Sequence, residues 1–326
     1  MHNDLWRNGK IKKSLWKKGL VFGIICLFIG ASVIPSLSGD IEKTNSTSNI
    51  DVFENQKNQI ISVISPLEEE WNKTFGGSGC DEGYSIIETS DNSFLLAGVT
   101  TSYGNGDYDG WLIKTDSNGD EIWNKTFGGI SQDQFLSIDE TSANGYIIAG
   151  STMSYGAGDH DVWLIKTDSN GDEIWNKTFG GTGYDFACSV QRTTDSGYIL
   201  TGTKDHAYGC GELWLIKTDD SGIMEWNKTF DAPGQDIGNS VQQTSDGGYI
   251  IGGEKGLSAT LKDLWVIKTD EYGNEIWNIS FDGGGRDVCE SIQETTDGGY
   301  IITGFKLFGS YAGDLWLIKI NDTGAM

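Results

Sequence analysis

The chain has 326 residues, a formal net charge of −24, 46 glycines and only three prolines. Residues 40–326 hold 17 basic and 46 acidic residues, and a negative field of that size repels nucleic-acid phosphates and anionic lipid. The composition therefore argues against nucleic acid as a partner and indicates a strongly solvated surface.

Residues 1–39 have the layout of a secretory signal. Six basic residues precede an apolar run from Leu20 to Ile34, and small residues follow, so that cleavage after Ser38 would suit a signal peptidase. The alternative is an uncleaved anchor, since residues 20–38 are nearly long enough to span a bilayer. In either case we expect export to the cell surface or the extracellular space. If the segment is not cleaved, we expect membrane contact only through residues 20–38.

Residues 40–65 are rich in Ser, Thr, Asn and Gln and show no period, so we expect a flexible polar tether. From there to residue 326 the chain consists of five repeats of 51–52 residues, each with two tryptophans at fixed positions. One set is Trp71, Trp123, Trp175, Trp226 and Trp277; the other is Trp111, Trp163, Trp214, Trp265 and Trp316. Between the glycine-rich turns of each repeat lie four short segments with strand composition.

Four short strands in about 50 residues, repeated along the chain, are typical of a propeller blade. We therefore expect an all-β fold over residues 66–326, a five-bladed β-propeller of four-stranded antiparallel blades. Residues 69–75 have the sequence of a last strand without its three partners, and the fifth repeat stops before its own last strand. We expect this N-terminal strand to complete the fifth blade and close the ring. The alternative is that the chain is part of a longer array.

The segment from Asp116 to Trp123 has the form Asp-x-x-Gly-x-x-x-Trp. It resembles the tryptophan-docking repeat of quinoprotein-alcohol-dehydrogenase-like propellers, and the order of residues from Ile250 to Trp277 is also similar to kelch repeats. In amino-acid sequence the repeats most resemble those of exported repeat proteins of archaea and bacteria. The resemblance covers residues 71–326 and implies an architecture rather than an activity. It implies that the tryptophans of the first set wedge between neighbouring blades.

One aspartate recurs where the innermost strand of each repeat begins. These residues are Asp81, Asp133, Asp185, Asp236 and Asp287. A ring of five carboxylates near the propeller axis would suit a hard cation such as calcium. The alternative is that each aspartate caps its own turn by accepting backbone N–H bonds. We expect no cofactor, and calcium at this ring is the one possibility left open.

The polar residues that stand out do so in every repeat, whereas catalysis needs one asymmetric constellation. The sequence has no His/Cys cluster with metal-ligand spacing and no Gly-x-Ser-x-Gly segment. We therefore expect a non-catalytic binding or scaffold module that presents five similar loop sets to an extracellular glycan or protein. The alternative is a carbohydrate-active hydrolase with a carboxylate pair on the propeller face. The sequence does not indicate the oligomeric state.

Four cysteines follow the export segment, and an oxidising compartment favours disulfides. The topology of the repeat favours a Cys188–Cys210 bridge within the third blade and a Cys80–Cys289 bridge over the ring closure. The alternative is buried free thiols. Seven Asn-x-Ser/Thr sites also occur, five of them directly after the first-set tryptophans. Asn45 in the tether is the candidate glycosylation site, with incidental sequence as the alternative, and the other sites are expected to be plain outer-strand sequence.

Overall fold

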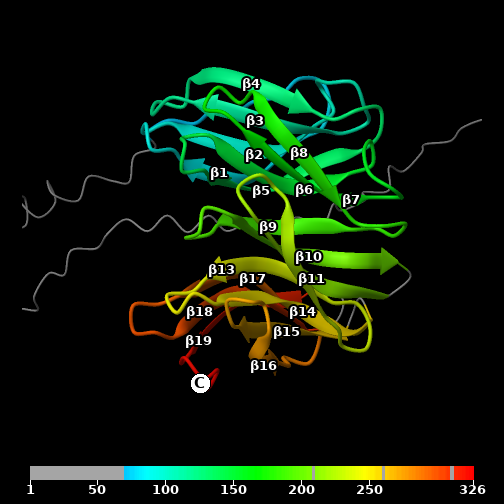
Figure 1. Cartoon of the computed structure of the whole chain (residues 1–326), viewed down its shortest axis with the longest axis vertical. Helices are drawn as coiled ribbons and strands as arrows, with labels where there is room; N and C mark the ends of the chain where they lie inside the picture. The colour runs from blue at the N-terminus through cyan, green and yellow to red at the C-terminus, as the bar shows by residue number, and fades with distance from the viewer. Residues whose placement is uncertain (1–69, 208–209, 259–260, 309–311) are drawn as a thin grey trace, which may run out of the picture. The chain divides into compact units, whose positions relative to one another are not determined.

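The computed structural model describes residues 70–207, 210–258, 261–308 and 312–326 (Figure 1). The expected export segment and most of the tether lie outside the described residues, as does Asn45. The described part of the chain is all-β and contains no helix, and therefore no helix long and apolar enough to cross a membrane.

Each strand pairs with its neighbours in the chain, so every sheet is an antiparallel meander. The first sheet consists of β1 (Asp81–Glu88), β2 (Phe94–Thr100), β3 (Asp109–Thr115) and β4 (Glu121–Phe127). The second consists of β5 (Asp133–Glu140), β6 (Tyr146–Thr152), β7 (Asp161–Thr167) and β8 (Glu173–Phe179). The third consists of β9 (Phe186–Arg192), β10 (Tyr198–Ala207), β11 (Cys210–Thr218) and β12 (Met224–Phe230). The fourth consists of β13 (Ile237–Gln243), β14 (Tyr249–Ser258), β15 (Leu261–Thr269) and β16 (Glu275–Phe281). The fifth has three described strands, β17 (Asp287–Glu294), β18 (Tyr300–Phe308) and β19 (Ala312–Ile320).

The turn between the third and fourth strands of each four-stranded sheet follows from its Asp-x-x-Gly sequence. In the first sheet, Asp116 Oδ1 accepts the backbone N–H groups of Asn118 at 2.8 Å and of Asp120 at 2.9 Å. Gly119 has a φ of +75°, a conformation that costs glycine nothing. Asp168 and Gly171 make the same turn in the second sheet.

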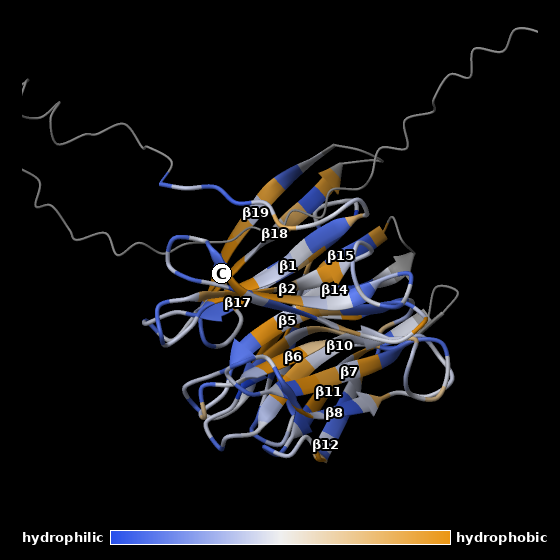
Figure 2. Cartoon of the chain, turned by 90° about the horizontal axis from the view of Figure 1, so that it is seen from above, coloured by the Kyte–Doolittle hydropathy of each residue, from blue (hydrophilic) through white to orange (hydrophobic). Residues whose placement is uncertain are grey.

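Successive sheets pack face to face, and the core lies between them. Leu95 and Leu112 of the first sheet share a buried cluster with Phe135, Ile148 and Trp163 of the second. Equivalent clusters join the second sheet to the third, the third to the fourth and the fourth to the fifth. Figure 2 shows apolar residues along the strands and polar residues in the connecting turns. Meander sheets that pack face to face in chain order have the arrangement of propeller blades.

The two end sheets each leave one face uncovered. Ile86 on the first sheet is 38 % exposed, whereas Ile292, its equivalent in the fifth repeat, is 2 % exposed. On the fifth sheet, Leu315 and Leu317 are 64 % and 65 % exposed. Their equivalents in the fourth sheet are fully buried against the fifth. The packing therefore runs from the first sheet to the fifth without forming a ring in this structure.

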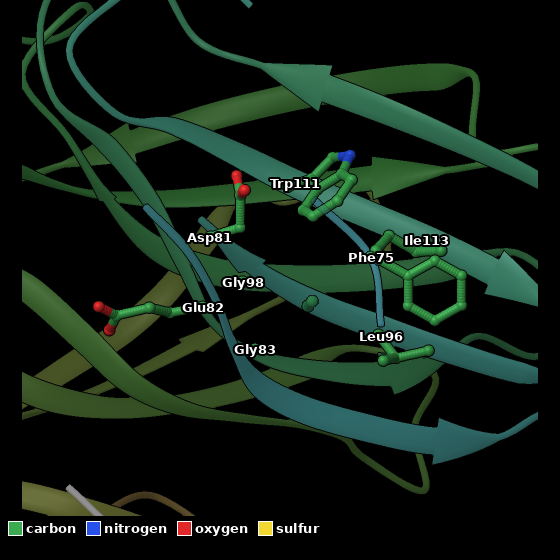
Figure 3. A pocket seen from close by; sticks show the side chains of 9 residues that line it. Phe75, Asp81, Glu82, Gly83, Leu96, Gly98, Trp111 and Ile113 are labelled. Atoms are coloured by element: carbon green, nitrogen blue, oxygen red, sulfur yellow. The ribbon is translucent and has the colours of Figure 1, made fainter. Parts of the chain in front are cut away.

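The expected closing strand at residues 69–75 was a wrong prediction for this structure, because residues 70–79 form no strand. Figure 3 shows Phe75 beside Leu96, Trp111 and Ile113 at a small cavity on the open face of the first sheet, with the Glu82 carboxylate pointing away. The side chains of this segment thus find partners on the first sheet, as those of β4 do on the second. No strand pairing joins the segment to β19.

Candidate functional site

A cavity of about 400 Å³ lies where the first three sheets come together. Its walls are polar and aromatic and come from the starts of inner strands and from the loops beside them. The lining residues are Glu82, Tyr84, Val99, Tyr108, Gln132, Asp133, Gln134, His160 and Tyr184. A volume of this size is typical of small-molecule sites.

Backbone hydrogen bonds between neighbouring sheets bring these residues together. The N–H of Asp133 donates to the carbonyl of Tyr108 at 2.8 Å, and the N–H of Asp185 donates to the carbonyl of His160 at 2.8 Å. Each bond fixes the loop before a third strand against the start of the next sheet's inner strand. Tyr108 and His160 therefore reach the same cavity as residues of β1 and β5.

The cavity's polar groups are held in place by one another. The hydroxyl of Tyr84 donates to Glu82 Oε2 at 2.8 Å, and the thiol of Cys80 donates to Glu82 Oε1 at 3.2 Å. Burial raises the pKa of Tyr84, and the hydrogen bond to Glu82 raises it further, so the phenol is a neutral donor at physiological pH. The ring of His160 lies 4.1 Å from that of Tyr184, and its Nδ1 is 2.9 Å from Asp159 Oδ1.

The sequence singled out only one lining residue, the recurrent Asp133, because most residues of this cavity do not repeat. Tyr84 corresponds to Leu136, Cys188, Asn239 and Glu290 in the later repeats, and Tyr108 corresponds to His160 and then to Gly211. A search for recurring residues passes over such positions. The signal that could have found the cavity is variation rather than recurrence. It consists of inner-strand positions at which otherwise similar repeats carry different kinds of side chain. The expected set of five equivalent binding loops is thus not what forms this site.

The five recurrent aspartates each accept hydrogen bonds in their own turn. In every case a carboxylate oxygen accepts the N–H of the residue four positions earlier, which is Gly77, Gly129, Gly181, Ala232 or Gly283. Only one group of three carboxylates within ligand distance of one another occurs in the described residues, and only Asp287 of the five belongs to it. The capping alternative thus matches the contacts, and the five do not come together as one site.

The first-set tryptophans lie across the boundaries between repeats. The rings of Trp71, Trp123, Trp175, Trp226 and Trp277 contact the turn glycines Gly119, Gly171, Gly222, Gly273 and Gly324 of the following repeats. The ring of Trp123 also lies 6.4 Å from that of Tyr146. These tryptophans are half-buried, except for Trp71, which is 40 % exposed.

Neither expected disulfide is formed, so both pairings were wrong predictions for this structure. Cys188 and Cys289 have free thiols. Cys289 is buried in the core between the fourth and fifth sheets, whereas Cys80 lies at the open first sheet and donates to Glu82. The Cys210 side chain lies outside the described residues. Burial raises the pKa of the Cys188 thiol to about 12, which keeps it protonated and unreactive.

The asparagines that follow the first-set tryptophans have structural partners. Asn227 and Asn278 each accept the indole N–H of the tryptophan on the neighbouring strand at 3.0 Å, and Asn124 does so at 3.2 Å. Asn124 also donates to Glu121 at 2.6 Å. The sequence pattern at these sites thus has a structural reason that is independent of glycosylation.

A second group of charged side chains joins the fourth and fifth sheets. Lys262 and Glu254 form an ion pair of 2.7 Å in which both side chains are almost fully buried. Arg286 donates to the same carboxylate through Nε at 2.9 Å and through its terminal nitrogen at 3.0 Å. With all its oxygens engaged, Glu254 is placed to stabilise the junction rather than to react.

No protein-family model matches the chain, and no curated protein matches it. Among solved structures, it is similar to a protein of unknown function from Bacteroides caccae, with 13% identity and a TM-score of 0.44 over 66% of this chain and 72% of that one. It is also similar to the Pan2 WD40 domain of Neurospora crassa, with 11% identity and a TM-score of 0.42 over 73% and 75% of the two chains. A third is the α-L-arabinofuranosidase Arb93A of Fusarium graminearum, with 12% identity and a TM-score of 0.43 over 76% and 98%. At these values the likeness is remote.

Proposed function

We propose that the chain is an exported, non-catalytic binding module of the cell surface or the extracellular space and that its ligand is a glycan. The observation that carries the proposal is the cavity at the first three sheets, which combines three tyrosines with two carboxylates and two amides. Export follows from the signal-like sequence of residues 1–39.

The chemistry of the lining suits a sugar. Tyr84, Tyr108 and Tyr184 offer ring faces for the apolar C–H face of a sugar ring. Glu82 and Gln134 offer acceptors and donors for its hydroxyl groups. Because several of these groups stand on strands, a ligand would need to order few of them when it binds.

A binding experiment with matched variants tests the proposal. We expect glycan-array binding without turnover, and we expect Tyr84→Ala to weaken it about tenfold, equivalent to losing an aromatic contact of ~1.4 kcal/mol. Tyr272→Ala is the control, since this tyrosine is 62 % exposed in a distant turn. Equal losses in both variants, or no glycan bound at all, would overturn the assignment.

A hydrolase is the second candidate, because the Glu82 carboxylate lines the same cavity and is held by two donors. It predicts release of reducing sugar in a hydrolysis screen and loss of turnover in Glu82→Gln with binding retained. If the parent chain binds the glycan but releases no hydrolysis product, the result supports the non-catalytic proposal instead.

We also propose that the architecture in solution is a closed five-bladed propeller. Leu315 and Leu317 occupy the positions that Leu264 and Val266 occupy in the fourth sheet, and those two are fully buried. Ile86 occupies the position of Ile292, which is buried against the fourth sheet. The uncovered faces of the two end sheets thus match the faces that pack together elsewhere in the chain.

A further inference from the structure

Three carboxylates converge where the fourth and fifth sheets meet. Asp263 lies near the start of β15, Asp282 directly follows β16, and Asp287 begins β17. One oxygen of each lies within 4.8 Å of the others. Asp287 is fully buried, Asp263 is half-buried and Asp282 is exposed, so the cluster is open to solvent on one side.

The buried member of this cluster has an oxygen without a hydrogen-bond donor. Asp287 Oδ2 accepts the N–H of Gly283, but Oδ1 is buried and has no partner. An unpartnered buried carboxylate oxygen costs free energy, so a cation or a water molecule that pairs with it would stabilise the folded chain.

The equivalent oxygen has a donor in each of the other four repeats. Asp81 Oδ1 accepts the hydroxyl of Thr100, and Asp133 Oδ1 accepts that of Thr152. Asp185 and Asp236 accept backbone N–H groups through the same oxygen, from Asp205 and Gly256. At the Thr152 position the last three repeats have Lys204, Lys255 and Lys306, and in the fifth repeat the N–H of the following residue, Leu307, donates to the carbonyl of Arg286 instead.

The third carboxylate has a counterpart in the third repeat, Asp231, but none in the first two repeats. The position of Asp282 is Gly128 in the first repeat and Gly180 in the second. Only in the fourth repeat does an acid here complete a group of three within the described residues. The extra negative charge thus coincides with the missing donor.

The nearby positive charges offset this cluster only in part. Burial raises the pKa of Asp287, and the charges of Asp282 and Asp263 raise it further, while Lys306 opposes them. The ammonium of Lys306 lies 5.4 Å from the centre of the Trp316 ring, and that of Lys255 lies 4.9 Å from the Trp265 ring. Three acids in close contact favour a bound cation.

We propose that Asp263, Asp282 and Asp287 bind one calcium ion. Carboxylate oxygens are hard ligands, and the cluster offers no nitrogen or sulfur that would select zinc. Gly284 donates its N–H to Asp282 Oδ1 at 2.7 Å, which leaves Oδ2 of that residue for the ion. Asp287 contributes its unpartnered Oδ1, and water from the open side completes the six to eight oxygens that calcium takes.

Titration of the chain with calcium chloride tests the proposal. We expect calorimetry to give one calcium per chain, with a dissociation constant of about 10⁻⁴–10⁻³ M, as in extracellular modules, and weaker binding of magnesium. We also expect calcium to raise the thermal midpoint, because the ion binds only the folded chain.

Asp282→Asn is the informative variant, because this residue is exposed and its replacement should not prevent folding. We expect it to weaken calcium binding at least about tenfold and to abolish the rise in thermal midpoint. Asp231→Asn, at the equivalent position of the third repeat, is the control and should retain both. No binding up to about 10 mM calcium, ten times the weakest expected constant, would overturn the proposal. Equal calcium affinity in both variants and the parent chain would also overturn it.

Discussion

The two tryptophans of each repeat differ in their burial. Trp163 is 2 % exposed and lies in the cluster between the first and second sheets, with its ring 5.5 Å from that of Phe135. Trp123 is half-buried and covers a turn glycine of the next repeat. The sequence drew attention to the docking tryptophan, but the fully buried one has more apolar area to lose.

We therefore expect Trp163→Ala to cost about 3–5 kcal/mol, the range for removing a large buried aromatic residue. We expect Trp123→Ala to cost less, about 1–3 kcal/mol, because part of its ring is already in water. Urea unfolding of the two variants and the parent measures both values. A larger loss for Trp123→Ala would mean that docking rather than burial governs stability.

Asp236 gives the chain a pH dependence on the mildly acidic side. Burial raises its pKa to about 6. Hydrogen bonds from the N–H groups of Ala232 and Gly256 lower this pKa, and the charge of Asp231 raises it. Between the unfolded value of about 3.9 and the folded value, the folded chain binds more protons than the unfolded chain. The free energy of unfolding contributed by this group therefore falls as the pH rises through that window.

We expect Asp236→Asn to make the decline in stability between about pH 4 and pH 6 shallower. Asp246→Asn is the control. Burial alone would raise the pKa of Asp246, but hydrogen bonds from Thr244 and Lys268 lower it to about 2, so its contribution is present above pH 4 and is lost as the pH falls. Denaturant titrations across this range measure both slopes. An unchanged slope in Asp236→Asn would contradict the assignment.

At the scale of the strand, the third strands of the first four sheets each carry a buried lysine that needs a carboxylate. In the third and fourth sheets, Lys217 and Lys268 pair with Asp195 and Asp246 in the first turn of their own sheet. The second sheet has Ala143 at that turn position. Lys166 pairs instead with Asp220 of the third sheet at 2.5 Å. One substitution in a turn thus converts a contact within a sheet into one between sheets.

Removing Asp220 should weaken the junction between the second and third sheets. We expect Asp220→Asn to cost about 1–3 kcal/mol, because Lys166 is buried and would lose its charged partner. Asp172→Asn is the control, since the Lys125–Asp172 pair also joins two sheets but lies at the surface, and we expect it to cost about 0–1 kcal/mol. Thermal or urea unfolding measures the difference. Similar costs would show that the two pairs are equally solvated.

The strands and turns could be predicted because they depend on residues that are neighbours in the sequence of each repeat. The Asp116–Gly119 turn and the apolar run of β6 need no knowledge of distant residues. The ion pair of Lys166 and the thiols of Cys188 and Cys289 depend on which sheets meet, and the sequence does not give the distances between them. The cavity at Tyr84 was missed for a further reason, since most of its residues, Asp133 excepted, lie at positions in which the repeats differ.

At the scale of the whole molecule, the uncovered end faces allow a test of ring closure. If the end sheets pack together in solution, Leu317 is buried as Val266 is, and Leu317→Asp should cost about 3 kcal/mol or more. Leu261→Asp is the control, because Leu261 is 63 % exposed at the start of β15 and its replacement should cost less than about 1 kcal/mol. Unfolding experiments compare the two. No loss for Leu317→Asp would mean that the fifth sheet stays open.

The contact between a docking tryptophan and the glycine of the next repeat also bears on how the chain can change in length. Trp123 contacts Gly171 in the same way that Trp175 contacts Gly222, and the sequence around both tryptophans is Glu-Ile-Trp-Asn-Lys-Thr-Phe. A recombination that joins Trp123 directly to Asn176 would remove one repeat and place Trp123 over Gly222. Every junction would keep a partner of the same kind. Unequal crossing-over between such gene segments would therefore produce shorter or longer relatives without a new interface having to evolve.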